Sequence, residues 1–169
     1  MPNEIHRKVA VAIADLDFDL AFAALDSLGD GDIAWSAPVT SMEDCEWAEV
    51  FYKIKVGTSP TAGGTIAFYA GRADDGSGEI RSGTDDITTT DHGTETTAAD
   101  VTRVLGTLGP VLHVVQVDGT SNIVYSGSFR IWYPGADFNV FVYNNTGVAF
   151  NGTSSPHVMR IRGNLPEIQ

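Results

Sequence analysis

The carboxylates come nearest to the spacing of a metal site. Asp15, Asp17 and Asp19 form a D-x-D-x-D run that looks like the start of a calcium loop. Such a loop needs a glycine at its sixth position and a glutamate at its twelfth, where this chain has Leu20 and Asp26. Period-two alternation explains the run more simply, as the solvent-facing side of a strand. We therefore predict a strand here and no calcium loop.

A second acidic group, Asp26, Asp30 and Asp32, flanks two glycines. These carboxylates could hold a cation between subunits, but hard cations need about six or more oxygen ligands. Aspartate and glycine also favour tight turns for backbone reasons alone. The group therefore predicts a turn, and a cation between subunits is the alternative.

The histidines and the single cysteine form no recognisable catalytic or zinc-binding motif. His6, His92, His113 and His157 have no zinc-ligand spacing among them, and Cys45 has no context that marks an activated nucleophile. The chain also lacks the G-x-S-x-G elbow of serine hydrolases. We predict no enzyme, no cofactor and no metal, although the sequence leaves open a triad assembled only in space. His113 is expected to be buried or at an interface, and His92 exposed.

Aromatic residues could form a sugar-binding platform. Aromatic side chains on strands more often pack in a core or an interface, so the platform is the weaker interpretation. The candidates are Trp35, Trp47, Trp132, Tyr125, Tyr133 and Tyr143.

Apolar residues recur at every second position through most of the chain, which predicts strands. In the clearest case five alternate residues, 48 to 56, share one face. Residues 33–39 predict an edge strand limited by Pro38, and 111–117 a strand buried on both faces. Further strands are expected at 65–70, 101–105, 123–133, 138–143 and 157–162. The pattern predicts an all-β, jelly-roll-like sandwich of about eight antiparallel strands, with at most one short helix.

The distribution of polar residues predicts the domain organisation. Residues 1–15 are expected to form a polar N-terminal arm, and residues 16–169 a single β-sandwich domain. Within that domain, residues 71–100 predict a long acidic surface loop with one short strand near Ile80. Because so long a loop is unusual in a compact domain, we expect it to be functional or to contact another subunit.

Charge and composition exclude several classes of function. The 169 residues include 22 acidic and 10 basic side chains, for a net charge of −12, which disfavours direct binding of nucleic acid. No apolar run is long enough to span a membrane, and no secretory signal is recognisable, so we expect synthesis in the cytoplasm. The single cysteine permits no internal disulfide. The sequons at Asn144 and Asn151 are interpreted as turns.

From about residue 46 onward the chain resembles small structural proteins of tailed bacteriophages. The likeness lies in the strand AEVFYKIKV (48–56), the turn GTSPTAGGTI (57–66) with the aromatic strand after it, the strand leading into NNTG (138–147), and HVMRIRG (157–163). The resemblance implies a jelly-roll-like virion component, either a capsid decoration (cement) protein or a tail-associated protein. It implies no catalytic residues.

The function expected from this resemblance is stabilisation of the assembled phage head by contacts between subunits. The expected partners are further copies of the chain, as a homotrimer, and the major capsid protein or other virion proteins. The expected location is the virion, on the capsid surface rather than the tail. One alternative is a tail or baseplate protein that binds a host glycan. The other is a polysaccharide-degrading enzyme, which would need paired carboxylates across a cleft.

Overall fold

The computed structural model describes residues 17–22, 24–40, 42–72, 79–82, 85–88, 93–135, 137–152 and 157–165. The predicted N-terminal arm, residues 1–15, lies outside the described residues, as do His6 and His92.

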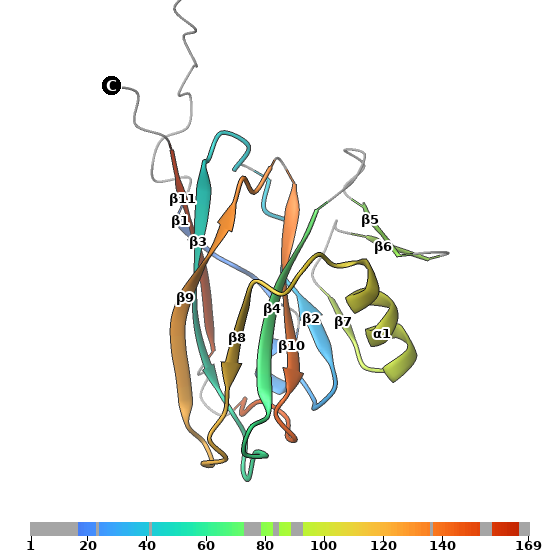
Figure 1. Ribbon diagram of the computed structural model, residues 1–169, viewed down its shortest axis with the longest axis vertical. Helices are drawn as coiled ribbons and strands as arrows, with labels where there is room; N and C mark the ends of the chain where they lie inside the picture. Colours follow the sequence, from blue (N-terminus) through green and yellow to red (C-terminus); the bar gives the residue numbers. More distant parts are fainter. Residues whose placement is uncertain are drawn as a thin grey trace, which may run out of the picture.

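Two antiparallel sheets form the body of the protein (Figure 1). The four-stranded sheet contains, in spatial order, β1 (Asp17–Asp19), β11 (Val158–Asn164), β3 (Trp47–Lys55) and β9 (Val124–Trp132). The five-stranded sheet contains β7 (Gly93–Glu95), β2 (Ile33–Trp35), β10 (Phe138–Asn145), β4 (Thr65–Arg72) and β8 (His113–Gln116). A separate hairpin pairs β5 (Glu79–Ser82) with β6 (Asp85–Thr88).

The strand order is that of a jelly roll. When β5, β6 and β7 are set aside, the remaining eight strands, renumbered along the chain, lie in the orders 1-8-3-6 and 2-7-4-5. A sandwich of eight strands in this order is a double Greek key. The prediction of an all-β, jelly-roll-like sandwich is therefore confirmed.

The main core lies between the two sheets and follows from the alternation of β3. Ala48, Val50, Tyr52 and Ile54 all point inward, with at most 7% of their surface exposed. They pack against inward side chains of the five-stranded sheet, among them Phe68, Val140 and Val142. The predicted inner face of this strand is thus confirmed.

A helix covers the outside of the five-stranded sheet, where the sequence predicted a strand at 101–105. That prediction was wrong: α1 spans Ala98–Thr107, with Thr97 as its N-cap. Val101, Val104 and Leu108 lie on one face of the helix and pack against Ile33, Trp35 and Phe141, which point outward from β2 and β10. The spacing of three and four residues between these side chains fits a helix and not the alternation of a strand.

The expected loop at 71–100 also contains regular structure. It holds the end of β4, then β5, β6, β7 and the first turn of α1. Because β7 pairs with β2, the predicted edge strand at 33–39 does not lie at an edge, and all three residues of β2 are buried. A short 3₁₀ turn, η2 (Leu25–Ser27), lies between β1 and β2.

The strand expected to be buried on both faces is instead an edge strand. β8 pairs only with β4 among the described strands, and Val114 is 47% exposed on its outer side. Val111 and Leu112, just before β8, are exposed as well. Apolar residues on both faces therefore mark a partly uncovered edge here and not a central strand.

Candidate interaction surface

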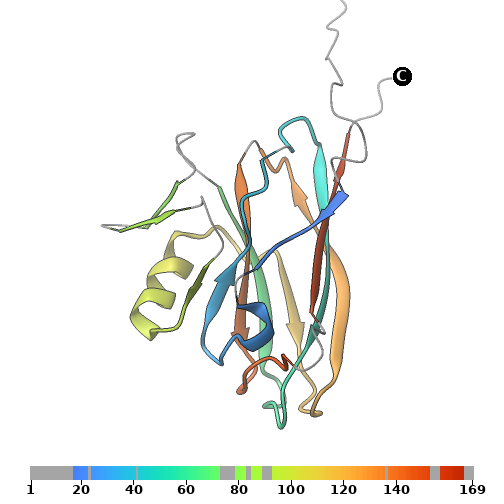
Figure 2. The same cartoon turned by 180° about the vertical axis from the view of Figure 1, so that it is seen from behind.

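The outer side of the four-stranded sheet carries no covering element among the described residues. Alternation along β3 directs residues 47, 49, 51, 53 and 55 away from the core, and no described element packs on them. Phe51 in the middle of this face is 38% exposed, and Trp132 on β9 is 54% exposed. The opposite flank of the sandwich differs, because there α1 covers the sheet, as the front and back views both show (Figures 1 and 2). The uncovered surface is called the outer face below.

The outer face gathers positive charge on a chain that is acidic overall. It carries five of the chain's ten basic residues and only three of its 22 acidic residues. The basic residues are Lys53, Lys55, Arg130, Arg160 and Arg162, and the acidic ones are Asp17, Asp19 and Glu49. The outer face thus has a formal charge of +2, whereas the whole chain has −12.

Two tryptophans form the aromatic end of the outer face. Trp47 on β3 and Trp132 on β9 are directly opposite each other in the strand register. The Arg130 guanidinium carbon lies 4.3 Å from the centroid of the Trp47 ring, which is a cation–π contact. Tyr133, the next residue after β9, is 66% exposed. This end therefore offers flat aromatic surface beside a cation.

A cleft of about 510 Å³ adjoins the same end of β9. It lies between the end of β9, the end of β4 and the segment that joins α1 to β8, and Pro110, Leu112 and Trp132 contribute to its walls. Among the described residues that line it, Arg130 is the only ionisable one. The described lining therefore does not supply the pair of facing carboxylates that glycoside hydrolysis would need.

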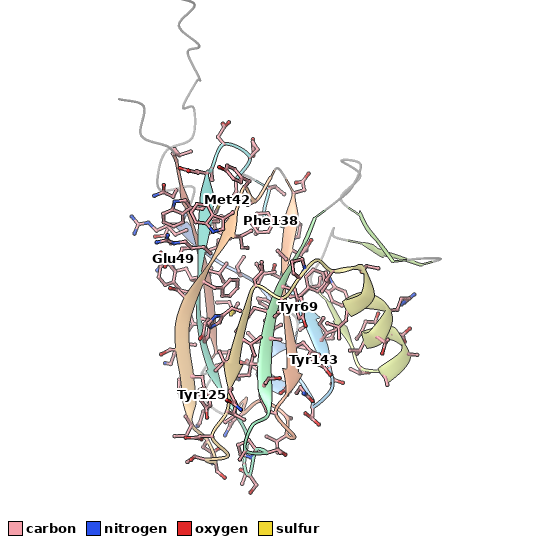
Figure 3. All side chains as sticks on the ribbon, viewed as in Figure 1. Met42, Glu49, Tyr69, Tyr125, Phe138 and Tyr143 are labelled. Atoms are coloured by element: carbon pink, nitrogen blue, oxygen red, sulfur yellow. The ribbon has the colours of Figure 1, made fainter. Side chains whose placement is uncertain are left out.

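The six candidate aromatics do not form one platform. Trp35 and Tyr143 pack in the cluster beneath α1. Figure 3 shows Tyr143 and Tyr69 on the helix-facing side of the sandwich and Glu49 on the opposite side. Tyr125 packs against the main core, and its hydroxyl donates to the Asp118 carboxylate at 3.0 Å. Only Trp47, Trp132 and the neighbouring Tyr133 lie at the outer face.

His113 is part of an aromatic cluster between the sheets, at their β8 and β9 edges. Its Nε2 lies 3.0 Å from the Tyr52 hydroxyl, and its ring stacks on Phe129 at a centroid distance of 5.7 Å. Burial lowers the pKa of His113 below its usual value. The sequence predicts His113 to be buried or at an interface, and the structure places it partly buried between the sheets, with the contacts of a structural residue.

His157 is buried and held in one tautomer. Its Nδ1 accepts a hydrogen bond from the Lys55 backbone N–H at 3.2 Å, so its Nε2–H donates to the Asn151 carbonyl at 3.1 Å. Burial lowers the pKa of His157 and outweighs the nearby Asp26 carboxylate, which raises it. A cavity of about 200 Å³ lies beside this ring, lined by Asp26 and otherwise mainly by apolar residues.

The acidic group at 26–32 forms a turn, as predicted. The Asp30 carboxylate accepts a hydrogen bond from the Gly147 backbone at 2.7 Å, and the Asp32 carboxylate accepts one from Gly29 at 3.1 Å. Burial raises the pKa of Asp32. In the described part of the chain, no three His, Cys, Asp or Glu side chains come together as a metal site would require.

The two described carboxylates of the D-x-D-x-D run belong to a strand, β1, as predicted. Asp17 and Asp19 lie on the outer side of β1, and the Asp17 carboxylate accepts from Arg160 Nε at 2.7 Å. Asp15 lies outside the described residues. Cys45 is 4% exposed, and burial raises its pKa, so its environment does not favour the reactive thiolate.

The sequon at Asn144 begins at the end of β10 and runs into the turn after it, and the Asn144 side chain is not accessible. Asn144 and Thr146 are fully buried. The Asn144 amide donates to the carbonyls of Leu28, Gly29 and Val148 at 2.8–2.9 Å, and its oxygen accepts from Thr146. This side chain fastens the end of β10 to the turn before β2.

No family model, curated protein or solved structure matches this chain. In the described part of the chain, no helix has the length and hydrophobicity needed to cross a membrane.

Sequence reasoning did not identify the outer face, although its signal was present. The outward positions 49, 51, 53 and 55 of β3 hold one acidic, one aromatic and two basic residues. The basic residues of β9 and β11 occupy the corresponding outward positions. Counting the charge of outward positions across these strands would have revealed a basic face on an acidic protein.

Proposed function

We propose that this chain is a structural protein of a tailed-bacteriophage virion and acts as a capsid decoration protein. The observation that carries the proposal is the uncovered outer face, which combines exposed aromatic and basic side chains on an otherwise acidic molecule. Exposed apolar patches with polar rims are typical of protein–protein contacts. The jelly roll, a fold of many viral capsid proteins, and the phage-like strand and turn sequences also support it.

The proposed mechanism is association alone, without a chemical step. Copies of the chain bind one another and the major capsid protein, as a homotrimer over junctions between capsid subunits. Because these contacts bind the assembled shell and not separated subunits, they stabilise assembly by mass action. The proposed location is therefore the surface of the head.

Microscopy of the parent particle tests this proposal directly. We expect the chain among the proteins of purified particles, and cryo-electron microscopy should place its density on the head. Particles stripped of the chain should lose their contents at a lower temperature, and adding the purified protein back should restore the difference. Absence of the chain from the head would contradict the proposal.

A tail or baseplate protein that binds a host glycan is the second candidate. The observation that favours it is the Trp47–Trp132 pair with Arg130 against it, since aromatic faces bind sugar rings and a cation suits acidic sugars. A glycan array with the purified protein, and with a Trp132→Ala variant as control, tests this candidate. Binding that the variant loses would support it, and silence of the wild-type protein across the array would count against it.

A further inference from the structure

In the described part of the chain, each sheet of the sandwich has two edge strands, and three of these four edges carry charged residues. β1 has Asp17 and Asp19, β7 has Glu95, and β9 has Arg130. Charged side chains and short length protect an edge against pairing with another chain, and β1 and β7 are also only three residues long. β8, the remaining edge strand, has the sequence HVVQ, without an acidic residue, a lysine or an arginine.

The backbone groups on the free side of β8 follow from its pairing with β4 (Figure 1). The Val117 N–H donates to the Gly64 carbonyl at 2.8 Å, and the register between the two strands continues from Gln116 to His113. In an antiparallel ladder, residues that bond to one neighbour alternate with residues that point away from it. The N–H and C=O groups of Val114 and Gln116 therefore point away from β4, where no described strand receives them.

The backbone donors on either side of these two residues are already used within the chain. The Leu112 N–H donates to the Phe68 carbonyl at 2.8 Å. The Asp118 N–H donates to the Tyr125 hydroxyl at 3.0 Å. The free backbone donors of this edge are thus confined to the residues immediately before and after Val115.

We propose that β8 pairs with β8 of a second copy across a two-fold axis, so that the two five-stranded sheets join edge to edge. With Val115 on the axis, Val114 of each copy is opposite Gln116 of the other, and the two free N–H groups of each copy find the two free carbonyls of its partner. A register shifted along the strand would instead direct a free carbonyl to the occupied N–H of Leu112 or Asp118. The edge is self-complementary, as an isologous contact requires.

The side chains beside these hydrogen bonds are apolar. Val114 is 47% exposed on the outer side of β8, and Val111 and Leu112 just before the strand are exposed as well. In the proposed register, each Val114 lies beside the partner's Gln116 and diagonally across the axis from the partner's Val114. Pairing therefore removes apolar surface from water in addition to satisfying the backbone.

The charge of the chain is compatible with contact between two copies at this edge. The net charge is −12, so two copies repel each other where their acidic residues approach. No acidic residue lies between Asp100 and Asp118 in the sequence, so β8 and the segment that leads into it add nothing to this repulsion. The inference goes beyond the proposed function and does not depend on it, because that function is carried by the outer face.

Sedimentation velocity of the full chain over a range of concentrations tests the inference. We expect a monomer–dimer equilibrium at high micromolar concentration, since a contact of this size is small for a protein interface. Higher ionic strength should strengthen the dimer, because salt screens the repulsion between two acidic copies. A chain that stays monomeric at millimolar concentration and high ionic strength would overturn the inference.

Val114→Lys and Val158→Lys form a matched pair of variants. Both valines are 47% exposed and both substitutions add one positive charge, but Val158 lies on the outer face. Val114→Lys should weaken dimerisation at least about tenfold, because a charged edge resists strand pairing and the two lysines lie near each other across the axis. Val158→Lys should dimerise like the wild-type protein. Equal weakening by the two variants, or no weakening by Val114→Lys, would contradict pairing through β8.

Disulfide formation tests the register. In the proposed dimer, residue 114 of one copy is opposite residue 116 of the other, at about 5.5 Å between Cα atoms. The two copies of residue 114 are diagonal neighbours, about 7–8 Å apart. A mixture of Val114→Cys with Gln116→Cys should therefore form an intermolecular disulfide faster than either variant alone. The native Cys45 is 4% exposed and should not compete. Equal rates for the mixture and the separate variants would overturn the register centred on Val115.

The outcomes separate this inference from the proposed function. If the chain dimerises as described but is absent from the phage head, the inference stands and the decoration function is wrong. If the chain is present on the head but forms only trimers in solution, and Val114→Lys leaves them unchanged, the decoration function stands and the two-fold pairing is wrong.

Discussion

The Tyr52 hydroxyl and the His113 Nε2 lie 3.0 Å apart and join the two sheets of the sandwich. Tyr52 belongs to β3 in the four-stranded sheet, and His113 to β8 in the five-stranded sheet. The rings of Phe68 and Phe129 surround the pair, with centroids 4.7 Å and 6.5 Å from the Tyr52 ring. A polar link is therefore set in an aromatic cluster, where it fixes the relative position of the sheets at their β8 and β9 edges.

Removal of this link should lower stability modestly. Tyr52→Phe deletes only the hydroxyl, so we expect the free energy of unfolding to fall by about 1 kcal/mol, the usual net value of one hydrogen bond. Urea unfolding of Tyr52→Phe, His113→Phe and the double variant gives the coupling energy between the two side chains. A coupling energy near zero would show that the hydroxyl and the ring act independently.

His113, which is partly buried, and His157, whose side chain is buried, should make the protein less stable as the pH falls below about 6.5. Burial lowers the pKa of His113 and of His157 in the folded chain, whereas both titrate near the usual value when the chain is unfolded. Below that value the unfolded chain binds protons that the folded chain does not, so the free energy of unfolding decreases. Above it both states are neutral at these sites, and they add no pH dependence.

Urea unfolding at a series of pH values from about 8 to about 5.5 measures this effect. A His113→Gln, His157→Gln variant should be less stable at neutral pH but show a flatter dependence over the same range. Identical slopes for the variant and the wild-type protein would assign the pH dependence to other groups.

The sandwich was predictable from the sequence because its central strands are buried on one side only. In β3, inward Val50 and Ile54 alternate with outward Glu49 and Lys53, and this contrast has no other simple structural explanation. The turns were predictable for a similar reason, since Asp30 and Asn144 satisfy backbone groups at chain reversals.

The helix α1, the exposed edge at β8 and the outer face were not predictable from the alternation of apolar residues. Val101 and Val104 are too few apolar residues to separate a short strand from a helix, and the N-cap contact of Thr97 with Asp100 is the local feature that favours the helix. Val114 is apolar although exposed, so the alternation rule assigned it to a buried strand. The outer face could be recognised only from the pairing of β3 with β9 and β11, which joins residues at least 69 positions apart.

Asn144 should be among the most sensitive polar residues of the chain. Its buried amide donates to three backbone carbonyls, and Asn144→Ala leaves these carbonyls without that donor. We expect a loss of about 3 kcal/mol in the free energy of unfolding, because the two N–H groups of the amide and its oxygen, which accepts from Thr146, all lose hydrogen bonds worth about 1 kcal/mol each. Asn144→Asp should not rescue stability, because a carboxylate keeps the shape but cannot donate.

The neighbouring residue supplies the control for this prediction. Asn145 is exposed at the end of β10, so Asn145→Ala should change stability by less than about 0.5 kcal/mol. Similar losses at both positions in thermal or urea unfolding would contradict the anchoring role of Asn144.

Two glycines should respond in opposite directions to the same substitution. Gly106 lies near the end of α1, and a Cβ added there meets no atom within 4 Å. Gly106→Ala should therefore raise the free energy of unfolding by about 0.5 kcal/mol, because alanine restricts the unfolded chain and favours the helix.

Gly147 has φ +84°, and a Cβ there would collide with the Thr61 hydroxyl. Gly147→Ala should cost at least about 2 kcal/mol from the left-handed backbone and the collision. Thermal unfolding of the two variants tests the pair, and a destabilised Gly106→Ala would show that the C-terminal turn of α1 needs glycine for a reason other than space.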